Sequence, residues 1–312
     1  MSTVAFKAEG VIPATLLAFK SDYSIDEAAT RAHLSDVGNV RGISSVAVNG
    51  HASEVHACSF EEQRLLVELA VDEIGKVVPV TCGIYADSGV QAARIARMAQ
   101  DAGAGALLLF PSQVFWMGAM SRPEMIFSHF EAVTAASDLP IIIFQYASNS
   151  ALCYPVSIIE QLVDRFPQIV GIKDASYDPQ THEYLTRTLQ ARPNPVTMFT
   201  SHSSWLLGSL SMGAKGILSG SGSVVAALQV ALFEAIGRGD LEAAKAVHKL
   251  IQPTADIFYS HPLVDMHNRM KEALVMMGKL DEAIVRPPLM KLHPEEIARV
   301  RQALVSAKLI AS

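Results

Sequence analysis

The sequence predicts an α/β fold, a (β/α)₈ barrel of the TIM-barrel type followed by a C-terminal helical appendix. Short runs rich in β-branched residues recur roughly every thirty residues, which is the length of one strand-helix unit. Amphipathic segments lie between these runs, and after Gly239 no further strand candidate is found. About eight strand-helix pairs favour a closed barrel. A doubly wound open sheet is the alternative, but a barrel leaves no edge strand.

The expected strands are short apolar runs. They cover residues 11–16, 44–48, 78–82, 106–109, 140–144, 169–172, 197–200 and 216–219. Ser59 and Glu62 have the spacing of a capping box, which predicts that a helix over residues 59–74 starts there. A second helix is expected over residues 88–102 and ends at Gly103.

The chain beyond the eighth strand reads as helices only. They are expected over residues 241–259, 266–277 and 294–307, and the run Arg286-Pro287-Pro288 separates the last two. Their methionines, Met266, Met270, Met276 and Met277, are expected to form a packing surface. We therefore expect residues 1–239 to form the barrel and residues 240–312 to form a helical region packed on it.

Composition excludes several classes of protein. Half of the 312 residues are hydrophobic and 18% are charged, which suits a large core. The net charge of -6 without a basic stripe argues against nucleic acid or a membrane surface as partners. The apolar stretch over residues 11–19 is too short for a membrane span and lacks a signal-peptide cleavage pattern, so we expect a cytoplasmic protein. Three widely spaced cysteines argue against a disulfide framework or a structural zinc.

One lysine stands at the end of an apolar strand. Lys173 follows the run over residues 169–172, and a buried parallel strand is normally apolar throughout. Burial disfavours the ammonium form, lowers the pKa and leaves a neutral amine that can attack a carbonyl. The alternative is a surface lysine paired with Asp174. Barrel enzymes carry their catalytic groups on the loops that follow the strands, which favours the first interpretation.

Polar residues follow other strands and should converge with Lys173 on one mouth. They include Asn49, His51 and Glu54 after the second strand, Tyr146 and Asn149 after the fifth, and Ser201 and His202 after the seventh. Glycines and serines over residues 219–223 follow the eighth strand. This last run suits either a phosphate site or a tight glycine turn that lines the pocket.

Four segments carry a resemblance to a known family. They are Gly171-Ile172-Lys173-Asp174-Ala175-Ser176, the Asn49-Gly50 turn with Glu54, Gly213-Ala214-Lys215-Gly216-Ile217 and Arg286-Pro287-Pro288-Leu289. Over nearly its whole length the chain resembles the dihydrodipicolinate synthase and N-acetylneuraminate lyase family. The resemblance implies a class I aldolase or lyase in which Lys173 forms a Schiff base with pyruvate or another 2-keto acid. It also implies that no metal or organic cofactor is needed, and that the chain forms a homotetramer of two dimers or a homodimer.

The chain departs from the family pattern at the tyrosine that moves protons in the family. The family motif Tyr-Asn-x-Pro aligns without gaps so that its tyrosine falls on Phe144. Tyr146 lies two residues further and, because side chains alternate along a strand, shares the inward face with Phe144. We expect Tyr146 to take the acid/base role. The alternative is a ring packed at the barrel rim with its hydroxyl in water.

The carboxylate-binding turn also differs. Where the family has two threonines, this chain has His51 and Ala52. Backbone N–H groups survive substitution, so the turn can still bind an anion, and His51 either adds a donor or satisfies only local backbone. Leu218 matches a family position whose main chain contacts the keto acid.

Further departures bear on the substrate. Residues 148–150 lack the arginine that grips the second substrate of true dihydrodipicolinate synthases, and residues 111–114 lack the tyrosine that a neighbouring subunit contributes. The polar groups Asn149, Ser150, Ser201 and His202 suit a hydroxylated ligand. We therefore expect cleavage or dehydration of a 2-keto-3-deoxy sugar acid.

Three alternatives remain open. The first is dihydrodipicolinate synthase proper, which joins pyruvate and aspartate semialdehyde. The second is a metal-dependent barrel enzyme that uses His51, Glu54 and His56 as ligands, which chelators would inhibit. The third is a keto-acid-binding protein that has lost catalysis, in which replacement of Lys173 would leave affinity unchanged.

Overall fold

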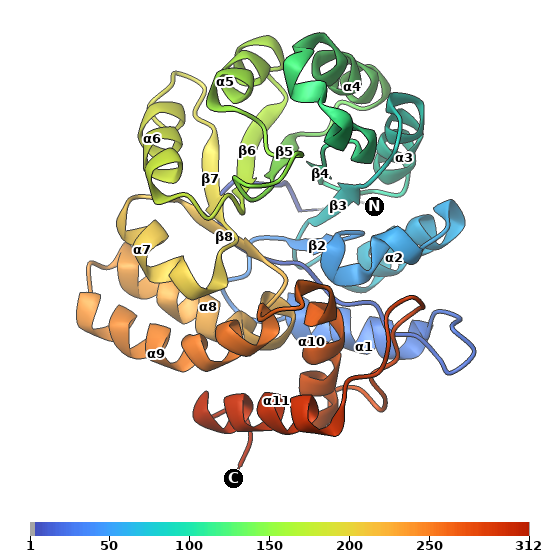
Figure 1. Cartoon of the computed structure of the whole chain (residues 1–312), viewed down its shortest axis with the longest axis vertical. Helices are drawn as coiled ribbons and strands as arrows, with labels where there is room; N and C mark the ends of the chain where they lie inside the picture. The colour runs from blue at the N-terminus through green and yellow to red at the C-terminus, as the bar shows by residue number, and fades with distance from the viewer. Residues whose placement is uncertain (1–3, 312) are drawn as a thin grey trace.

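The computed structural model describes residues 4–311 and shows a closed parallel barrel (Figure 1). The strands are β1 (Gly10–Pro13), β2 (Val46–Val48), β3 (Val80–Ile84), β4 (Ala106–Leu109), β5 (Ile141–Gln145), β6 (Ile169–Asp174), β7 (Thr197–Thr200) and β8 (Gly216–Ser219). They pair in parallel in the order β1-β8-β7-β6-β5-β4-β3-β2. Bridges from Val11 to Ile43 and from Ala14 to Ala47 join the first and second strands and close the barrel. The expected TIM barrel is confirmed.

Helices surround the barrel and then continue beyond it (Figure 1). They are α1 (Glu27–Gly38), α2 (Phe60–Ile74), α3 (Gly89–Asp101), α4 (Pro123–Ala136), α5 (Val156–Arg165), α6 (Pro179–Leu189), α7 (Leu206–Ser211), α8 (Gly222–Gly237), α9 (Leu241–Phe258), α10 (Met266–Met276) and α11 (Pro294–Ser306). Short 3₁₀ helices include η1 (His51–Ser53), η3 (Gln113–Met117) and η6 (Leu263–Asp265). None of the helices between residues 4 and 311 is long and apolar enough to span a membrane.

Local sequence signals account for the ends of several helices. Ser59 accepts a hydrogen bond from the Glu62 amide, and the Glu62 side chain accepts one from the Ser59 amide, so the capping box is confirmed. Ser88 caps α3 through the Gln91 amide. Gly103, with φ of 91°, follows the end of α3 in the left-handed conformation that glycine adopts most readily.

The predicted strand over residues 11–16 is too long. The β1 ladder ends at Pro13, and the amide of Leu16 donates to the Ser223 side chain instead of to a neighbouring strand. β6 is longer than predicted and continues to Asp174. Lys173 therefore lies inside the strand, where its backbone pairs in register with Phe144 of β5.

The barrel interior depends on two glycines. The Phe199 ring lies against both glycines. A Cβ added to Gly171 would lie 2.8 Å from Cε2 of Phe199, and a Cβ added to Gly216 would lie 2.3 Å from Cδ1 of Phe199, so neither position has room for a side chain. Gly171 therefore faces the same interior as Phe199. Because side chains alternate along a strand, Lys173 faces this interior as well.

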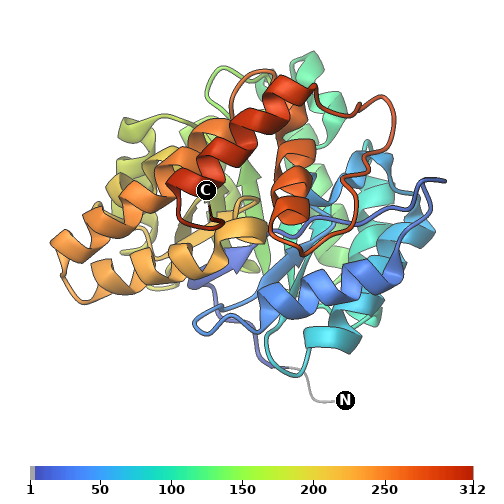
Figure 2. The same cartoon turned by 90° about the horizontal axis from the view of Figure 1, so that it is seen from below.

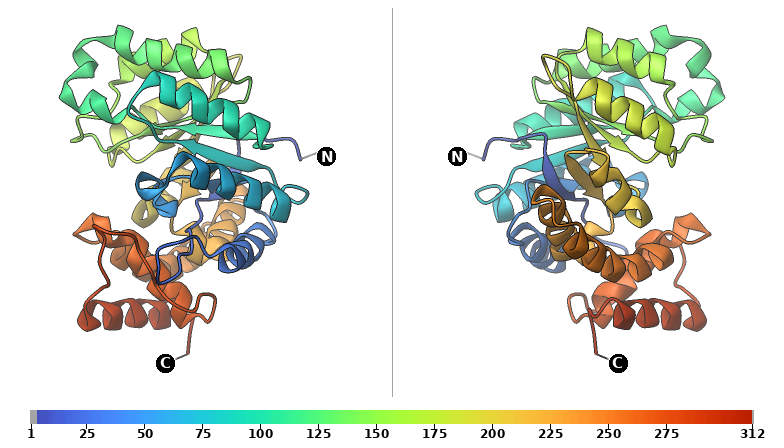
Figure 3. Two further views of the ribbon diagram at one scale, coloured as in Figure 1. Left: turned by 90° about the vertical axis from the view of Figure 1, so that its right-hand side faces the viewer. Right: turned by 90° about the vertical axis from the view of Figure 1, so that its left-hand side faces the viewer.

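The C-terminal helices pack against one side of the barrel. Figure 2 shows α9, α10 and α11 grouped together, and Figure 3 shows α11 at the end of the molecule away from α4 and α5. α10 contacts α8 and η1, which follows β2. Buried residues of α10, including Met270, Ala273 and Leu274, join the apolar cluster that fills the barrel. The appendix thus reaches the loops at the carboxyl ends of the strands.

Candidate active site

A cavity of about 450 Å³ opens at the carboxyl ends of the strands, beside the segment that leads into α10. Its size is in the range of small-molecule sites. The barrel contributes Ala14, His51, Ala52, His56, Tyr85, Phe144, Tyr146, Ala147, Lys173, Ala175, Tyr177, Ser201 and Gly220. The C-terminal region contributes Tyr259, Leu263, Val264, Met266, His267 and Met270. Of the polar residues that the sequence expected to converge on one mouth with Lys173, only His51, Tyr146 and Ser201 line this cavity.

Lys173 is the buried amine of this cavity. Its side chain is 6% exposed, and its Nζ lies 4.8 Å from the centroid of the Phe144 ring. Burial lowers the pKa of Lys173 to about 7, because the ammonium ion loses its hydration. A large share of the amine is then neutral at physiological pH, which is the nucleophilic form.

The Asp174 carboxylate does not pair with Lys173. It accepts hydrogen bonds from the Ser176 amide and hydroxyl, and its Oδ2 lies 2.6 Å from His182 Nδ1. His182 Nε2 in turn lies 2.8 Å from the Ser209 hydroxyl. Among the described residues Lys173 forms no ion pair, so the expected alternative of a Lys173–Asp174 surface pair is wrong. The neighbouring carboxylate is held by β6–α6–α7 contacts and leaves the amine unpaired.

Tyr146 and His51 form a hydrogen-bonded pair in the same cavity. The Tyr146 hydroxyl lies 2.7 Å from His51 Nε2. Burial raises the pKa of Tyr146 well above its usual value, and a hydrogen bond from Gln113 acts in the opposite direction. Burial, and then the charge of Lys173, lowers the pKa of His51 to about 3. The pair is therefore a phenol and a neutral imidazole near neutral pH.

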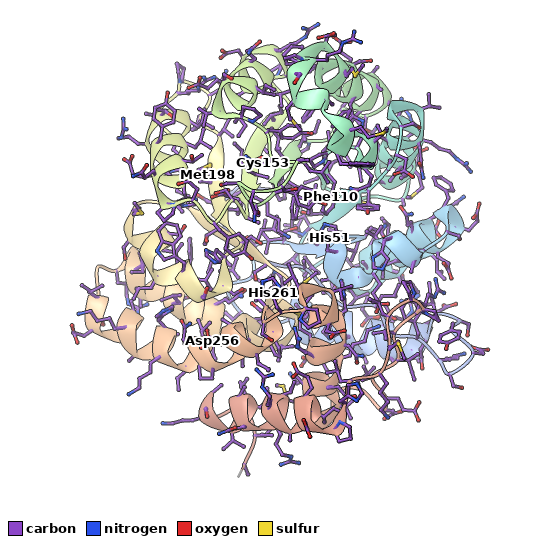
Figure 4. All side chains as sticks on the ribbon, in the orientation of Figure 1. His51, Phe110, Cys153, Met198, Asp256 and His261 are labelled. Atoms are coloured by element: carbon purple, nitrogen blue, oxygen red, sulfur yellow. The ribbon has the colours of Figure 1, made fainter. Side chains whose placement is uncertain are left out.

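Aromatic side chains fix the orientation of this pair. The His51 ring meets Phe110 edge to face with centroids 4.8 Å apart, and Phe144 at 5.4 Å. Figure 4 shows the labels of His51 and Phe110 next to each other, on the side of the barrel where β2, β3 and β4 lie. Phe144 also contacts Tyr146, with ring centroids 4.6 Å apart. The strand alternation predicted that Phe144 and Tyr146 share one face, and both side chains do line the cavity.

The turn after β2 offers backbone donors. Ser53 and Glu54 amides donate to the carbonyls of Gly50 and His51, whereas the amides of His51 and Ala52 make no hydrogen bond to another described residue. Ala52 lines the cavity. Two N–H groups are thus free at the cavity wall, where they can bind an anion.

Leu218 lies deeper than this turn. Its side chain is fully buried in the apolar cluster inside the barrel and does not line the cavity. Any contact with a ligand would have to come from its main chain. The adjoining Gly220 does line the cavity, as expected for a tight glycine turn.

The serines that follow β8 have no free hydroxyls for the phosphate site that was the alternative there. Ser221 is hydrogen-bonded to Ser203, Ser219 and Gln229, and Ser223 donates to the Ala14 carbonyl. These serines are 2% exposed or less. Their hydroxyls hold the loop together instead of facing the cavity.

Three of the four polar residues expected to meet a hydroxylated ligand do not line the cavity. Asn149 is exposed, and Ser150 accepts a hydrogen bond from the Leu152 amide within its own turn. The His202 ring packs edge to face on Tyr177, with centroids 3.8 Å apart. Ser201 alone reaches the wall. The loop after β5 turns outward beyond Ala147, which its sequence does not reveal.

Glu54 belongs to the scaffold and not to the cavity. Its Oε1 lies 2.5 Å from Lys271 Nζ of α10, and its Oε2 accepts the Arg286 amide at 3.1 Å. Both ends of the Glu54–Lys271 pair are buried, so the pair ties the β2 turn to the appendix. The carboxylate that the metal-enzyme alternative required is therefore engaged. Between residues 4 and 311 no group of three His, Cys, Asp or Glu side chains is placed to hold a metal.

Sequence reasoning missed the outer wall of the cavity. Tyr85 follows β3, Tyr177 follows β6 with φ of 57°, and Tyr259 ends α9. Met266 and Met270 were expected to serve packing alone, yet they also line the cavity, with Met270 1% exposed. No local sequence pattern shows which face of α10 lies over the mouth of the cavity, because the orientation of α10 depends on its contacts with segments far away in the sequence.

Comparison with known proteins identifies the family. The sequence model of the dihydrodipicolinate synthetase family matches residues 7–307. A 4-hydroxy-tetrahydrodipicolinate synthase of Methanopyrus kandleri is 27% identical over 304 residues, which cover 96% of this chain and 97% of that protein. The putative 2-dehydro-3-deoxy-D-gluconate aldolase YagE of Escherichia coli strain K12 is 24% identical over 96% of this chain and 97% of its own length.

Solved structures share the fold. The structure of YagE from E. coli K12 in complex with pyruvate superposes with a TM-score of 0.87 at 24% identity and covers 97% of this chain and 99% of that one. A monomeric dihydrodipicolinate synthase variant superposes with a TM-score of 0.87 at 20% identity, covering 97% of each chain.

Proposed function

The chain belongs to the dihydrodipicolinate synthetase family and is a lyase of that family, and we propose from this premise that Lys173 forms a Schiff base with a 2-keto acid. The observation that carries the proposal is a buried amine without an ion pair in the cavity at the carboxyl ends of the strands. Its lowered pKa supplies the neutral nucleophile without help from another base. The chemistry is covalent catalysis by the protein's own amine and needs no cofactor.

The first step forms the covalent bond. The Lys173 nitrogen pair attacks C2 of the keto acid, and the C2=O π pair moves to oxygen, which takes up a proton as the nitrogen loses one. The hydroxyl of this carbinolamine then takes up a second proton and leaves as water with the C–O pair, and the nitrogen pair forms the protonated C=N bond. The resulting iminium withdraws electrons from the neighbouring carbons.

The second step breaks a carbon-carbon bond. A base takes the proton from the C4 hydroxyl, the O–H pair becomes the new C4=O bond, and the C3–C4 pair becomes the enamine C2=C3 bond as the iminium π pair returns to nitrogen. Protonation at C3 and hydrolysis then release pyruvate and free Lys173. Aldol addition is the reverse, and dehydration passes through the same iminium.

Tyr146 is the group that we propose to move these protons, with His51 as its neighbour. The raised pKa of the Tyr146 hydroxyl keeps it protonated at rest, and the neutral imidazole at 2.7 Å can accept that proton or return it. The free amides of His51 and Ala52 are the proposed donors to the keto acid carboxylate, and the main chain of Leu218 in β8 is the proposed further contact. His51 thus has both a backbone and a side-chain role.

A 2-keto-3-deoxy sugar acid, as expected from the sequence, is one substrate of this class. The name of the E. coli relative supports this substrate, whereas of the four polar residues expected to meet a hydroxylated ligand only Ser201 lines the cavity. Dihydrodipicolinate synthase proper is less well supported, because the cavity wall holds no arginine for a second carboxylate. We also propose a homodimer or homotetramer, which light scattering can test.

Reductive trapping tests the proposal. The protein is treated with borohydride and each of a panel of 2-keto acids, and the intact mass is measured. We expect one reduced pyruvyl group per chain, and no adduct on Lys173→Ala with an unchanged circular dichroism spectrum. Absence of any adduct with every keto acid would refute the proposal. Binding of pyruvate with unchanged affinity by Lys173→Ala would instead support a non-catalytic keto-acid-binding protein.

A further inference from the structure

Aromatic and aliphatic side chains make up much of the cavity lining. The barrel loops contribute the aromatic side chains of Tyr85 and Tyr177 to it. Leu263 and Val264 of η6 and Met266 of α10 also belong to it. Since the cavity of about 450 Å³ exceeds what a three-carbon keto acid fills, this lining has to meet another part of the substrate.

Charge is nearly absent from the lining. Lys173 is the only lysine among the lining residues, and no arginine, aspartate or glutamate is among them. Burial lowers the pKa of two of the three lining histidines, His51 and His267, so these two do not replace the missing charges. The third, His56, is exposed. A carboxylate or ammonium group on the second substrate would therefore find no oppositely charged Lys, Arg, Asp or Glu side chain in this lining beyond Lys173, which the Schiff base occupies.

Several polar atoms of the wall are already engaged within the protein. The Tyr259 hydroxyl accepts the Ser221 amide at 3.0 Å, and Nδ1 of His267 lies 3.1 Å from the Val264 carbonyl. The Tyr146 hydroxyl is taken by His51. The lining groups left for a chain of several hydroxyls are then Ser201, the hydroxyls of Tyr85 and Tyr177 and the His56 ring. Any buried hydroxyl beyond these would stay unpaired, which is unfavourable.

We infer that the second substrate is an apolar aldehyde, with an aliphatic or aromatic side chain that lies between Tyr85 or Tyr177 and the η6–α10 segment. This inference rests on the proposed Schiff-base function. In the addition direction, C3 of the pyruvate enamine bonds to the aldehyde carbon, and the C=O π pair moves to oxygen, which takes a proton from Tyr146. Hydrolysis of the iminium releases a 4-hydroxy-2-keto acid with an apolar tail. Leu263 and Val264 are then specificity-determining residues.

The test compares aldol addition of pyruvate to propanal, pentanal and D-glyceraldehyde by the wild-type protein. We expect kcat/KM for pentanal to exceed that for propanal, and to exceed that for glyceraldehyde by tenfold or more, since each added methylene contributes to binding in an apolar site. Val264→Thr replaces a methyl group by a hydroxyl at nearly equal volume. It should lower the pentanal-to-glyceraldehyde ratio by about threefold or more, whereas Val90→Thr, at a residue 83% exposed on α3, should not change it.

The outcomes separate this inference from the function on which it rests. If pyruvate forms the Lys173 adduct but glyceraldehyde reacts as well as pentanal, the inference is wrong and the Schiff-base function stands. An unchanged ratio in both Val264→Thr and Met266→Gln would also overturn it. If pyruvate forms no adduct, the Schiff-base function fails and the inference fails with it.

Discussion

The pH dependence of Schiff-base formation follows from the burial of Lys173. Burial lowers the pKa of Lys173 from 10.5 to about 7. At pH 7 about half of this amine is neutral, whereas an ordinary lysine is neutral in roughly one molecule in 3,000, so burial raises the reactive fraction by roughly a thousandfold. The rate rises with pH through the pKa of Lys173, because only the deprotonated amine is nucleophilic. Lowering the pKa moves the rise in rate to lower pH.

The assay measures the initial rate of adduct formation with pyruvate in excess cyanoborohydride from pH 5.5 to 9, by intact mass. We expect about a tenfold rise per pH unit below 7 and a plateau above it. Ala175→Glu places a carboxylate in the same cavity and should move the plateau up by about one pH unit, and Ala175→Gln is the matched neutral control. A rate that keeps rising tenfold per unit to pH 9 would show that the reacting amine is an ordinary exposed lysine.

The remaining predictions concern the proton carrier and two buried groups. Tyr146→Phe should slow steady-state turnover roughly 10²–10⁴-fold while pyruvate trapping persists, because acid/base assistance is lost and the nucleophile is kept. Lys271→Met should lower the free energy of unfolding in urea by about 3–5 kcal/mol, since it leaves the Glu54 carboxylate buried without its partner. His33 is 4% exposed with no hydrogen-bond partner on either ring nitrogen, and burial lowers its pKa to about 4. Below pH 6.5 the unfolded chain therefore binds a proton at His33 and the folded chain does not. Acidification from pH 7 to 5 should lower the free energy of unfolding by about 2 kcal/mol through this residue, and His33→Leu should abolish that part of the loss.

Each of these predictions has a contradicting result. An unaltered turnover in Tyr146→Phe would transfer the proton relay to water or His51. A urea midpoint in Lys271→Met equal to that of the wild type would mean that the buried pair does not stabilise the fold. Parallel losses of stability on acidification in the wild type and His33→Leu would exclude His33 as a proton-linked site.

The barrel and its lysine could be predicted from local patterns. The run Ile169–Val170–Gly171–Ile172 is apolar and, except for the partly buried Val170, fully buried, and Lys173 after it departs from the apolar pattern. The capping residues Ser59 and Ser88 mark helix starts within a few residues of sequence. Such features depend on neighbours along the chain, which a sequence displays directly.

The outer half of the site could not be predicted, because it depends on contacts between distant segments. The mouth is covered by Leu263, Val264 and Met266, whose orientation follows from how α10 packs on the β2 turn through Glu54 and Lys271. Similarly, the expected strand does not reach residue 16, where the Leu16 amide donates to the side chain of the distant Ser223. The polar run over residues 148–150 looked like ligand-binding sequence, yet it lies outside the cavity lining.

The central claim is that one particular amine is the nucleophile, and peptide mapping of the reduced adduct tests it most directly. The protein is reduced in the presence of pyruvate, digested and analysed by tandem mass spectrometry. The account predicts a single modified residue, Lys173, in every adduct-bearing chain at pH 7. Modification spread over surface lysines, or an equal yield of adduct in Lys173→Ala, would contradict it.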